Sequence, residues 1–203
     1  MKKRTTLDET FVDMWGDYAH WNKLNHKRAG LASFVSYMLL PGTTAINIYR
    51  IAHWFDGLNI RLASRLMQNL AIMLTGTDIN PRSEIGPGFI LFHPVSSEFT
   101  GKIGKNAIIA GALKVGGDGT SPDIGAGPGL PVIGDNVQFG VDVMILGPFK
   151  IGDNCWLYSR ASIFKDIPEG SMVAGTPARV IGQVTPGSNM YERGRVGMGH
   201  SDK

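Results

Sequence analysis

The sequence IGDNVQFGVDVMILGPFKIGDNCWLYSRASI, residues 133–163, repeats an apolar side chain at every sixth position. The repeated residues are Ile133, Phe139, Ile145, Ile151, Leu157 and Ile163. Neither a helix, with a period of about 3.6, nor a simple alternating strand produces this spacing. A period of six is typical of short parallel strands joined by tight turns, three to a coil, stacked as a triangular β-helix.

The same period continues toward the amino terminus, with one break at Ser97. The further repeated residues are Ile79, Ile85, Leu91, Ile103, Ile109 and Val115. We expect each of them to point inward and to stack on the next coil, roughly 4.8 Å away. The residue four positions later should also point inward; Ser83, Val95, Ala107, Val137, Val143, Cys155 and Ala161 hold this position. Cys155 is therefore interpreted as a core residue, and the glycine that often follows a repeated residue as relief for the corner backbone.

The chain outside the repeat has a different organisation. Residues 1–75 have helical patterns, such as LASFVSYMLL before Pro41-Gly42 and NIRLASRLMQNLAIML with one apolar face. The β-helix is expected over residues 76–183, with four to five coils. Residues 117–131, GDGTSPDIGAGPGLP, cannot stack as a coil and are expected to form an extruded loop. Residues 184–203 are expected to form a loose tail.

Composition excludes several classes of protein. The net charge of +3 comes mainly from the two ends of the 203-residue chain and does not predict nucleic-acid binding. The single cysteine excludes an intramolecular disulfide and suits a reducing cytoplasm. The start, MKKRTTLDETF, lacks the apolar segment of a signal peptide, and AGLASFVSYMLLPG is too short to span a bilayer. We expect a soluble cytoplasmic protein without stable membrane insertion.

One histidine lies within the apolar sequence PGFILFHPVSSEF, residues 87–99. His93 is either a packed core residue or a group placed for proton transfer, and composition alone favours the core. It is also the one histidine of the repeat region, so the repeats cannot build a three-histidine zinc site, and we expect no metal. His53, in YRIAHW, is expected to pack between elements rather than to act in catalysis.

Several motifs together resemble a known family. They are LLPGTTAINIYRIAHWF, GTDINPRSEIG, FILFH, KVGGDG and AGTPARVIG, and the likeness covers roughly residues 30–183. They are similar to the serine acetyltransferase branch of the left-handed β-helix, or hexapeptide-repeat, acyltransferases. The resemblance implies an α+β fold: an amino-terminal helical domain, then a left-handed parallel β-helix with one extruded loop. It also implies acetyl-CoA as co-substrate, and a homotrimer with active sites between neighbouring subunits.

The resemblance assigns catalysis to Asp78 and His93. Fifteen residues separate them, and because a coil has about eighteen residues, they should lie on adjacent coils near the same corner. His93 would take the proton from the acceptor as it attacks the thioester, and Asp78 would orient the imidazole and stabilise its charged form. Backbone amides of Gly116 and Gly117 are candidates to bind the oxyanion. With this spacing, His93 is interpreted as a general base.

The acceptor side departs from the family pattern. Phe92 stands where the family has an aspartate, and Gly129 and Leu130 stand where it has an arginine and a histidine. A pocket that exchanges charged contacts for Phe92 and Leu130 would bind a zwitterion poorly, because the zwitterion would lose water with nothing in return. The acceptor is therefore predicted to be a hydroxyl compound other than free serine, such as a sugar, a polysaccharide unit or a specialised metabolite.

The CoA side departs as well. Val141, Asp142 and Arg160 are bulkier than the small residues of the family's turns. Ser159, Arg160, Lys165 and Arg179 are candidate CoA-binding residues, since phosphates favour cationic donors, although each cation has the alternative of a solvated surface position. An alternative function follows from these turns: a catalytically inactive homologue that acts as a scaffold or regulatory subunit. Retention of Asp78 and His93 favours the acyltransferase.

Overall fold

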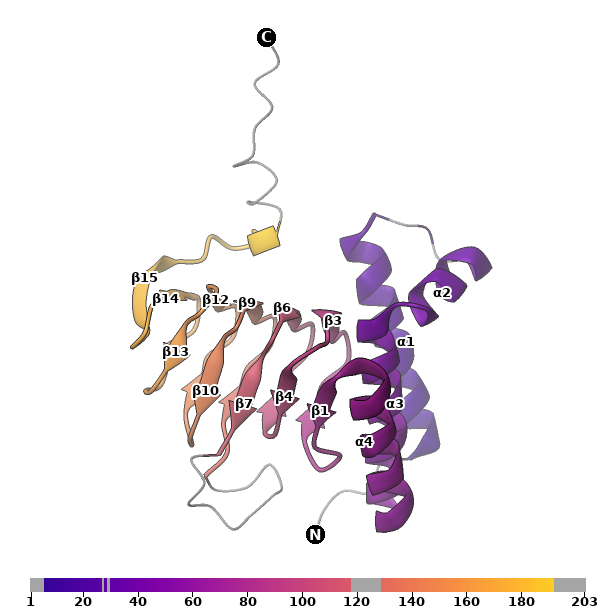
Figure 1. Ribbon diagram of the computed structural model, residues 1–203. Helices are drawn as coiled ribbons and strands as arrows, with labels where there is room; N and C mark the ends of the chain where they lie inside the picture. Colours follow the sequence, from indigo (N-terminus) through magenta and orange to yellow (C-terminus); the bar gives the residue numbers. More distant parts are fainter. Residues whose placement is uncertain (1–5, 27, 29, 118–128, 192–203) are drawn as a thin grey trace.

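The protein, seen in a computed structural model, consists of a helical region followed by stacked strands (Figure 1). The structure describes residues 6–26, 28, 30–117 and 129–191, so most of the predicted loop and the last part of the predicted tail lie outside the described residues. The helices are α1 (Leu7–Leu24), α2 (Leu31–Met38), α3 (Pro41–Gly57) and α4 (Arg61–Thr75). They occupy the end of the stack at which β1 and β3 lie (Figure 1).

Local chemistry explains where these helices begin and end. Thr6 caps α1: its side chain accepts a hydrogen bond from the Glu9 amide, and the Glu9 carboxylate accepts one from the Thr6 amide. Pro41 opens α3, where a missing N–H costs nothing. Gly76 ends α4 with a φ of 67°, a left-handed conformation that glycine adopts readily.

The strands form the three sides of a β-helix. Side A consists of β1 (Thr77–Ile79), β4 (Ser97–Phe99), β7 (Lys114–Gly116), β10 (Met144–Leu146) and β13 (Ser162–Ile163). Side B consists of β2 (Glu84–Ile85), β5 (Lys102–Ile103), β8 (Val132–Ile133) and β11 (Lys150–Ile151). Side C consists of β3 (Ile90–His93), β6 (Ile108–Gly111), β9 (Gln138–Val141), β12 (Trp156–Leu157), β14 (Ser171–Ala174) and β15 (Arg179–Gln183). All pairs are parallel except β14–β15, and the predicted α+β fold with a left-handed β-helix is confirmed.

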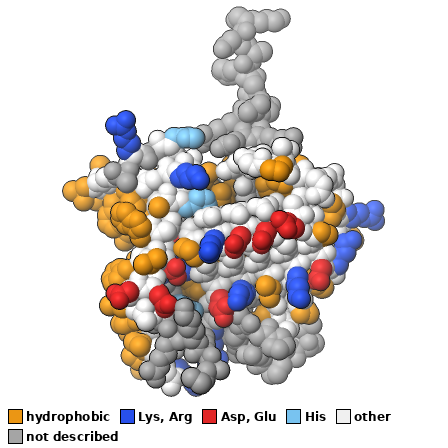
Figure 2. Space-filling model, turned by 180° about the vertical axis from the view of Figure 1, so that it is seen from behind, with side chains coloured by type: hydrophobic (Ala, Val, Ile, Leu, Met, Phe, Trp, Pro, Cys, Tyr) orange, Lys and Arg blue, Asp and Glu red, His pale blue; other side chains and the backbone are white. Residues whose placement is uncertain are grey.

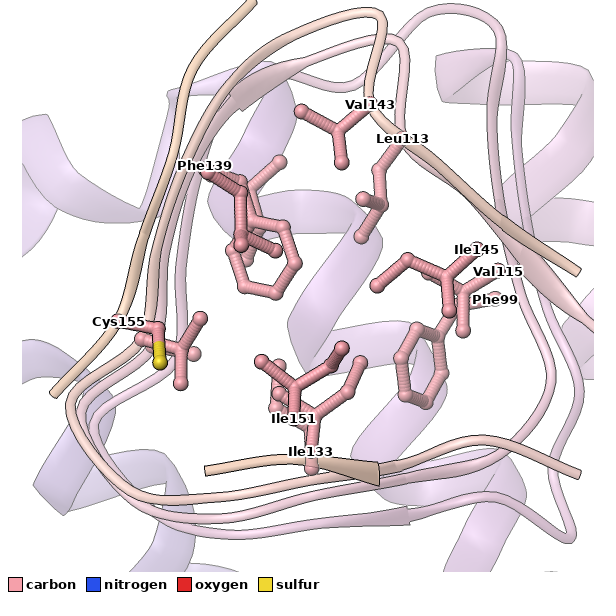
Figure 3. Packing of buried hydrophobic residues seen from close by; sticks show 14 of the residues in the cluster. Phe99, Leu113, Val115, Ile133, Phe139, Val143, Ile145, Ile151 and Cys155 are labelled. Carbon is pink, nitrogen blue, oxygen red and sulfur yellow. The ribbon is translucent and has the colours of Figure 1, made fainter. Parts of the chain in front are cut away.

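The repeated apolar residues form the core of the stack. All twelve are buried, and they line up from coil to coil, as Ile103, Ile133 and Ile151 do on side B. Figure 3 shows the three sides enclosing these side chains, with Cys155 among them. The Cys155 side chain is fully buried, and this burial raises the pKa of its thiol, so its interpretation as a core residue is confirmed.

One predicted inward position is wrong. Val95 is 69% exposed and lies beside Gly76. The corner between β3 and β4 is longer than the repeat, so that Phe99 rather than Ser97 is in register with Ile79. Ser97 is buried at the start of β4 instead, and its hydroxyl oxygen accepts a hydrogen bond from the Leu113 amide.

The role assigned to the repeat glycines is also corrected. A Cβ at Gly104 or Gly134 would lie 2.8 Å from backbone atoms of the next coil, so glycine is needed for close stacking rather than for an unusual backbone angle. The left-handed corner conformation belongs to asparagines: Asn106, Asn136 and Asn154 each have a φ of 57°. Asparagine tolerates this region because its short polar side chain can form local hydrogen bonds.

A buried ion pair attaches the helices to the first coil. Asp17 of α1 accepts two hydrogen bonds from the Arg50 guanidinium of α3, both of 3.1 Å, and a third from the Phe89 amide. Arg50 also donates to the carbonyl of Gly86, at 2.7 Å.

In the described chain no single helix has the length and apolarity to cross a membrane, although α2 and α3, bent by 84°, satisfy that test as a pair.

Candidate active site

Asp78 and His93 lie beside the corner where side C meets side A. His93 is the last residue of β3, and Asp78 is the middle residue of β1. The Thr77 hydroxyl donates to the Pro94 carbonyl at 2.8 Å, and the Ser96 amide donates to the Gly76 carbonyl at 3.0 Å. These bonds join the neighbours of both residues, so the segments that carry Asp78 and His93 are side by side.

His93 is not a packed core histidine. Its side chain is exposed, although Leu91, two residues earlier, is buried in the core. Gly111 of β6 lies next to His93 in register, and a Cβ at Gly111 would come within 2.8 Å of the His93 Cβ. The glycine leaves the space in which the imidazole is held at the corner.

Asp78 lies on the outer face of side A and is held by α4. Its Oδ1 accepts a hydrogen bond of 2.6 Å from the Gln68 side-chain amide. Among the described residues, no hydrogen bond joins the Asp78 carboxylate to His93. The orienting role given to Asp78 therefore stays a prediction, and Gln68 is a contact that the sequence analysis missed.

Two candidate CoA-binding residues, Ser159 and Arg160, lie on later coils at the same corner as His93. The bulky residues Val141 and Asp142 lie there as well. Val141 follows His93 in register, with Gly111 between them. The Val141 amide donates to the Ser159 hydroxyl at 3.0 Å, and the Arg160 amide donates to the Val141 carbonyl at 2.9 Å. Asp142 and Arg160 both adopt left-handed conformations there, with φ of 62° and 63°. The structure thus brings Val141, Asp142, Ser159 and Arg160 to one edge.

The remaining predicted site residues lie at several places around the stack. Arg179 pairs with Ala174 at the last coil of side C. Lys165 follows β13, on a different corner from His93. The Phe92 ring is 5.8 Å from that of Tyr191, centroid to centroid. Leu130 is buried beside Gly117.

A cavity of about 400 Å³ opens on the outer face of side A. It contains Asp78 together with both proposed oxyanion glycines, and it is lined also by Arg65, Gln68, Asn80, Glu98, Thr100, Lys114 and Leu146. Lys114 Nζ and Glu98 Oε1 form an ion pair of 2.6 Å inside it. Sequence reasoning missed these charges, although Asp78, Glu98 and Lys114 each directly precede a buried residue of side A and so share its outer face.

His53 connects a helix to the first coil. The His53 Nδ1 lies 2.7 Å from the Pro81 carbonyl oxygen, a contact between α3 and the first coil.

Within the described ranges, no group of three or more histidine, cysteine, aspartate or glutamate residues is arranged to hold a metal ion. Figure 2 shows charged side chains in rows that run from coil to coil on the side opposite to that of Figure 1. Lys102 and Glu84, 2.7 Å apart, are one pair on side B.

Comparison with known proteins identifies relatives but no family model matches. Serine acetyltransferase of Mycobacterium tuberculosis is 32% identical over 148 residues, which are 72% of this chain and 63% of that protein. Serine acetyltransferase of Helicobacter pylori is 30% identical over 146 residues, 71% of this chain and 83% of that protein. The chain thus spans less than two thirds of the first of these relatives and most of the second.

Solved structures agree with the fold. Two structures of Neisseria gonorrhoeae serine acetyltransferase, the second in complex with serine, have TM-scores of 0.79 and 0.75 at 24% and 25% identity. They cover 89% and 85% of this chain, and the match spans 69% of each.

These relatives contradict the prediction of an acceptor other than free serine, which is wrong. The prediction considered Phe92, Gly129 and Leu130 and found no charge to bind a zwitterion. The charged groups that line the cavity beside Asp78 come instead from α4, β4 and β7. The apolar substitutions on one side therefore do not make the site apolar. By its sequence and its fold, this chain belongs to the serine acetyltransferase family.

Proposed function

We propose that this protein is an acetyl-CoA-dependent serine O-acetyltransferase in which His93 is the general base. One observation carries the proposal: in a chain of this family, the exposed His93 and the Asp78 carboxylate lie beside one corner of the coil stack. A histidine kept out of the core, on a segment that is hydrogen-bonded to the segment of a carboxylate, suits proton transfer better than core structure.

The reaction needs one proton acceptor and one proton donor. His93 takes the proton of the serine hydroxyl as its oxygen attacks the thioester carbonyl of acetyl-CoA. The tetrahedral intermediate collapses with formation of the ester C–O bond and cleavage of the C–S bond, and the CoA sulfur receives the proton from the imidazolium. Backbone amides near Gly116 and Gly117, which line the same cavity as Asp78, are proposed to stabilise the oxyanion.

Asp78 is proposed to stabilise the imidazolium that forms during attack. Its Oδ1 is bound by Gln68, which fixes the carboxylate on the outer face of side A. Catalytic hydrogen bonds are often long in the free enzyme and tighten only in the substrate complex. Direct contact between Asp78 and His93 is therefore expected when both substrates are bound.

Acetyl-CoA is proposed to follow the corner from His93 toward the last coil. Ser159 and Arg160 lie on this corner, and Arg179 lies at its far end. Guanidinium groups suit the phosphates of CoA because they donate paired, charge-assisted hydrogen bonds. Lys165 stays a prediction, and its place on another corner makes it the weakest member of this set.

The protein is further proposed to act in the cytoplasm as a homotrimer. Exposed apolar side chains on the helices, such as Phe11, Trp15, Leu62 and Leu66, support self-association, because a lone chain gains nothing from keeping them in water. Sedimentation equilibrium should give the mass of three chains. A monomer at micromolar concentration would contradict this proposal.

The catalytic assignment is tested by His93→Asn, with release of the CoA thiol as the readout. Cys155, the one cysteine of the chain, is buried with a raised thiol pKa, so a thiol reagent reports CoA alone. We expect the variant to keep the wild-type melting temperature and to lose about 10²–10⁴-fold in kcat, the usual contribution of a general base. Asp78→Asn should lose less, because it leaves the base in place.

Two results would decide against the proposal. A fully active His93→Asn variant would exclude His93 as the base. Wild-type protein that neither binds acetyl-CoA in calorimetry nor acetylates serine would instead favour the inactive scaffold, with Val141, Asp142 and Arg160 closing the CoA groove.

A further inference from the structure

The cavity on side A contains charged groups that already have a partner and one that has none among the described residues. Asp78 is bound by Gln68, and Lys114 is paired with Glu98, both at 2.6 Å. Arg65 lines the same cavity, yet within the described part of the chain no carboxylate forms an ion pair with it. The cavity therefore offers one cation whose hydrogen-bond donors are available to a ligand.

The position of Arg65 is set by α4. It precedes Gln68 by three residues, and residues three apart on a helix are neighbours on the same face. Since the Gln68 side chain reaches Asp78, the Arg65 side chain extends over the same part of side A. A guanidinium presents paired donors whose spacing matches the two oxygens of a carboxylate.

An amino-acid acceptor requires such a cation. Its carboxylate loses water on entering the site and needs a charged partner in return, while its ammonium needs carboxylates. Phe92 is apolar, Gly129 has no side chain, and Leu130 is buried, so none of these three residues supplies a charge. Glu98, on the outer face of side A, supplies a carboxylate that the ammonium would share with Lys114.

We infer that Arg65 binds the carboxylate of the amino-acid acceptor and thereby determines that the acceptor is an amino acid. The inference rests on the proposed function and adds to it a specificity residue on α4. Arg65 acts on substrate binding and not on proton transfer, so its loss should raise KM for serine and leave kcat nearly unchanged.

The test compares two acceptors that differ only at the carboxyl group. Serine carries a carboxylate, whereas L-serinamide carries a neutral amide and keeps the hydroxyl and the ammonium. Initial rates of CoA release are measured at saturating acetyl-CoA for wild type, Arg65→Ala and Arg65→Lys. Arg61→Ala, one turn earlier on the same face of α4 but outside the lining of the cavity on side A, is the matched control.

We expect Arg65→Ala to lower kcat/KM for serine about ten- to hundredfold, as for the loss of one charge-assisted hydrogen-bonded contact. Its kcat/KM for serinamide should stay within about twofold of wild type, so that the preference for serine disappears. Arg65→Lys should fall between wild type and Arg65→Ala, because it keeps the charge and loses the paired donors. Arg61→Ala should match wild type with both acceptors.

Three outcomes would overturn the inference. An Arg65→Ala variant with unchanged KM for serine excludes the contact. Equal losses with serine and serinamide would mean that Arg65 supports the fold of the site and not the carboxylate. Wild-type protein that releases no CoA with serine would refute the proposed function itself, and the inference with it, and this result is distinct from the first two.

Discussion

His93 depends on the absence of a side chain at Gly111. A methyl group there would lie 2.7 Å from the His93 carbonyl oxygen and 2.8 Å from its Cβ, and neither atom is the flexible end of a side chain. Gly111→Ala should therefore displace the imidazole and lower kcat about 10²-fold, the order of loss expected from a shift of about 1 Å.

The control for this prediction is Gly182→Ala in β15, where the nearest atom to a new Cβ is the Met172 sulfur at 3.8 Å. This variant should keep wild-type kcat. Melting temperatures of both variants separate a local shift of His93 from loss of the fold. Full activity of Gly111→Ala would mean that the position of His93 is not critical, and would weaken its assignment as the base.

At the same scale, the sequence predicted some residues of the candidate site and missed others for a definite reason. Asp78 and His93 could be found because both lie in recognisable motifs. Arg65 and Gln68 could not, because they belong to a helix that looked amphipathic and whose position over side A is decided by tertiary contacts. The prediction of the acceptor was wrong for the same reason. It considered only the positions at which the family has its charged residues, such as Phe92, Gly129 and Leu130.

At the scale of the element, the corners are stabilised by an asparagine ladder. Asn106 donates from its side-chain amide to Asn136, and Asn136 donates to Asn154, both at 3.1 Å. Asn136→Gly should lose the ladder bonds and keep the left-handed corner, at a cost below about 1 kcal/mol for exposed bonds. Asn136→Ala should cost about 1–2 kcal/mol more, because its Cβ is strained in this conformation.

Urea unfolding of the two variants measures this difference. Equal destabilisation by glycine and alanine would show that the ladder bonds, and not the backbone conformation, stabilise the corner.

The period of six predicted the coils because every inward position is repeated. It could not predict the long corner before Ser97, because the eight residues from Leu91 to Phe99 are compensated by only four from Phe99 to Ile103, which restores the later register while Val95 lies in solvent.

At the scale of the whole molecule, the buried pair Asp17–Arg50 joins α1 to α3, and its hydrogen bonds with Phe89 and Gly86 attach both helices to the first coil. Breaking such a pair by removing one partner costs about 3–5 kcal/mol, because an uncompensated charge stays in the interior. Arg50→Met leaves Asp17 with the Phe89 amide alone and removes the donors to Gly86. The helices should then separate from the coils at lower denaturant than the coils unfold.

Tryptophan placement makes this separation measurable. Trp15, Trp21 and Trp54 lie in the helices, and Trp156 lies in the stack, so fluorescence reports mainly the helical region. In wild type, fluorescence and far-ultraviolet circular dichroism should give one coincident transition, because a joined molecule unfolds as a unit. In Arg50→Met the fluorescence transition should come first, and in Asp17→Leu/Arg50→Met, which buries no lone charge, the two should move back together. Coincident transitions in Arg50→Met would mean that the remaining contacts, such as apolar packing and the Gln68–Asp78 hydrogen bond, are enough to hold the helices on the first coil.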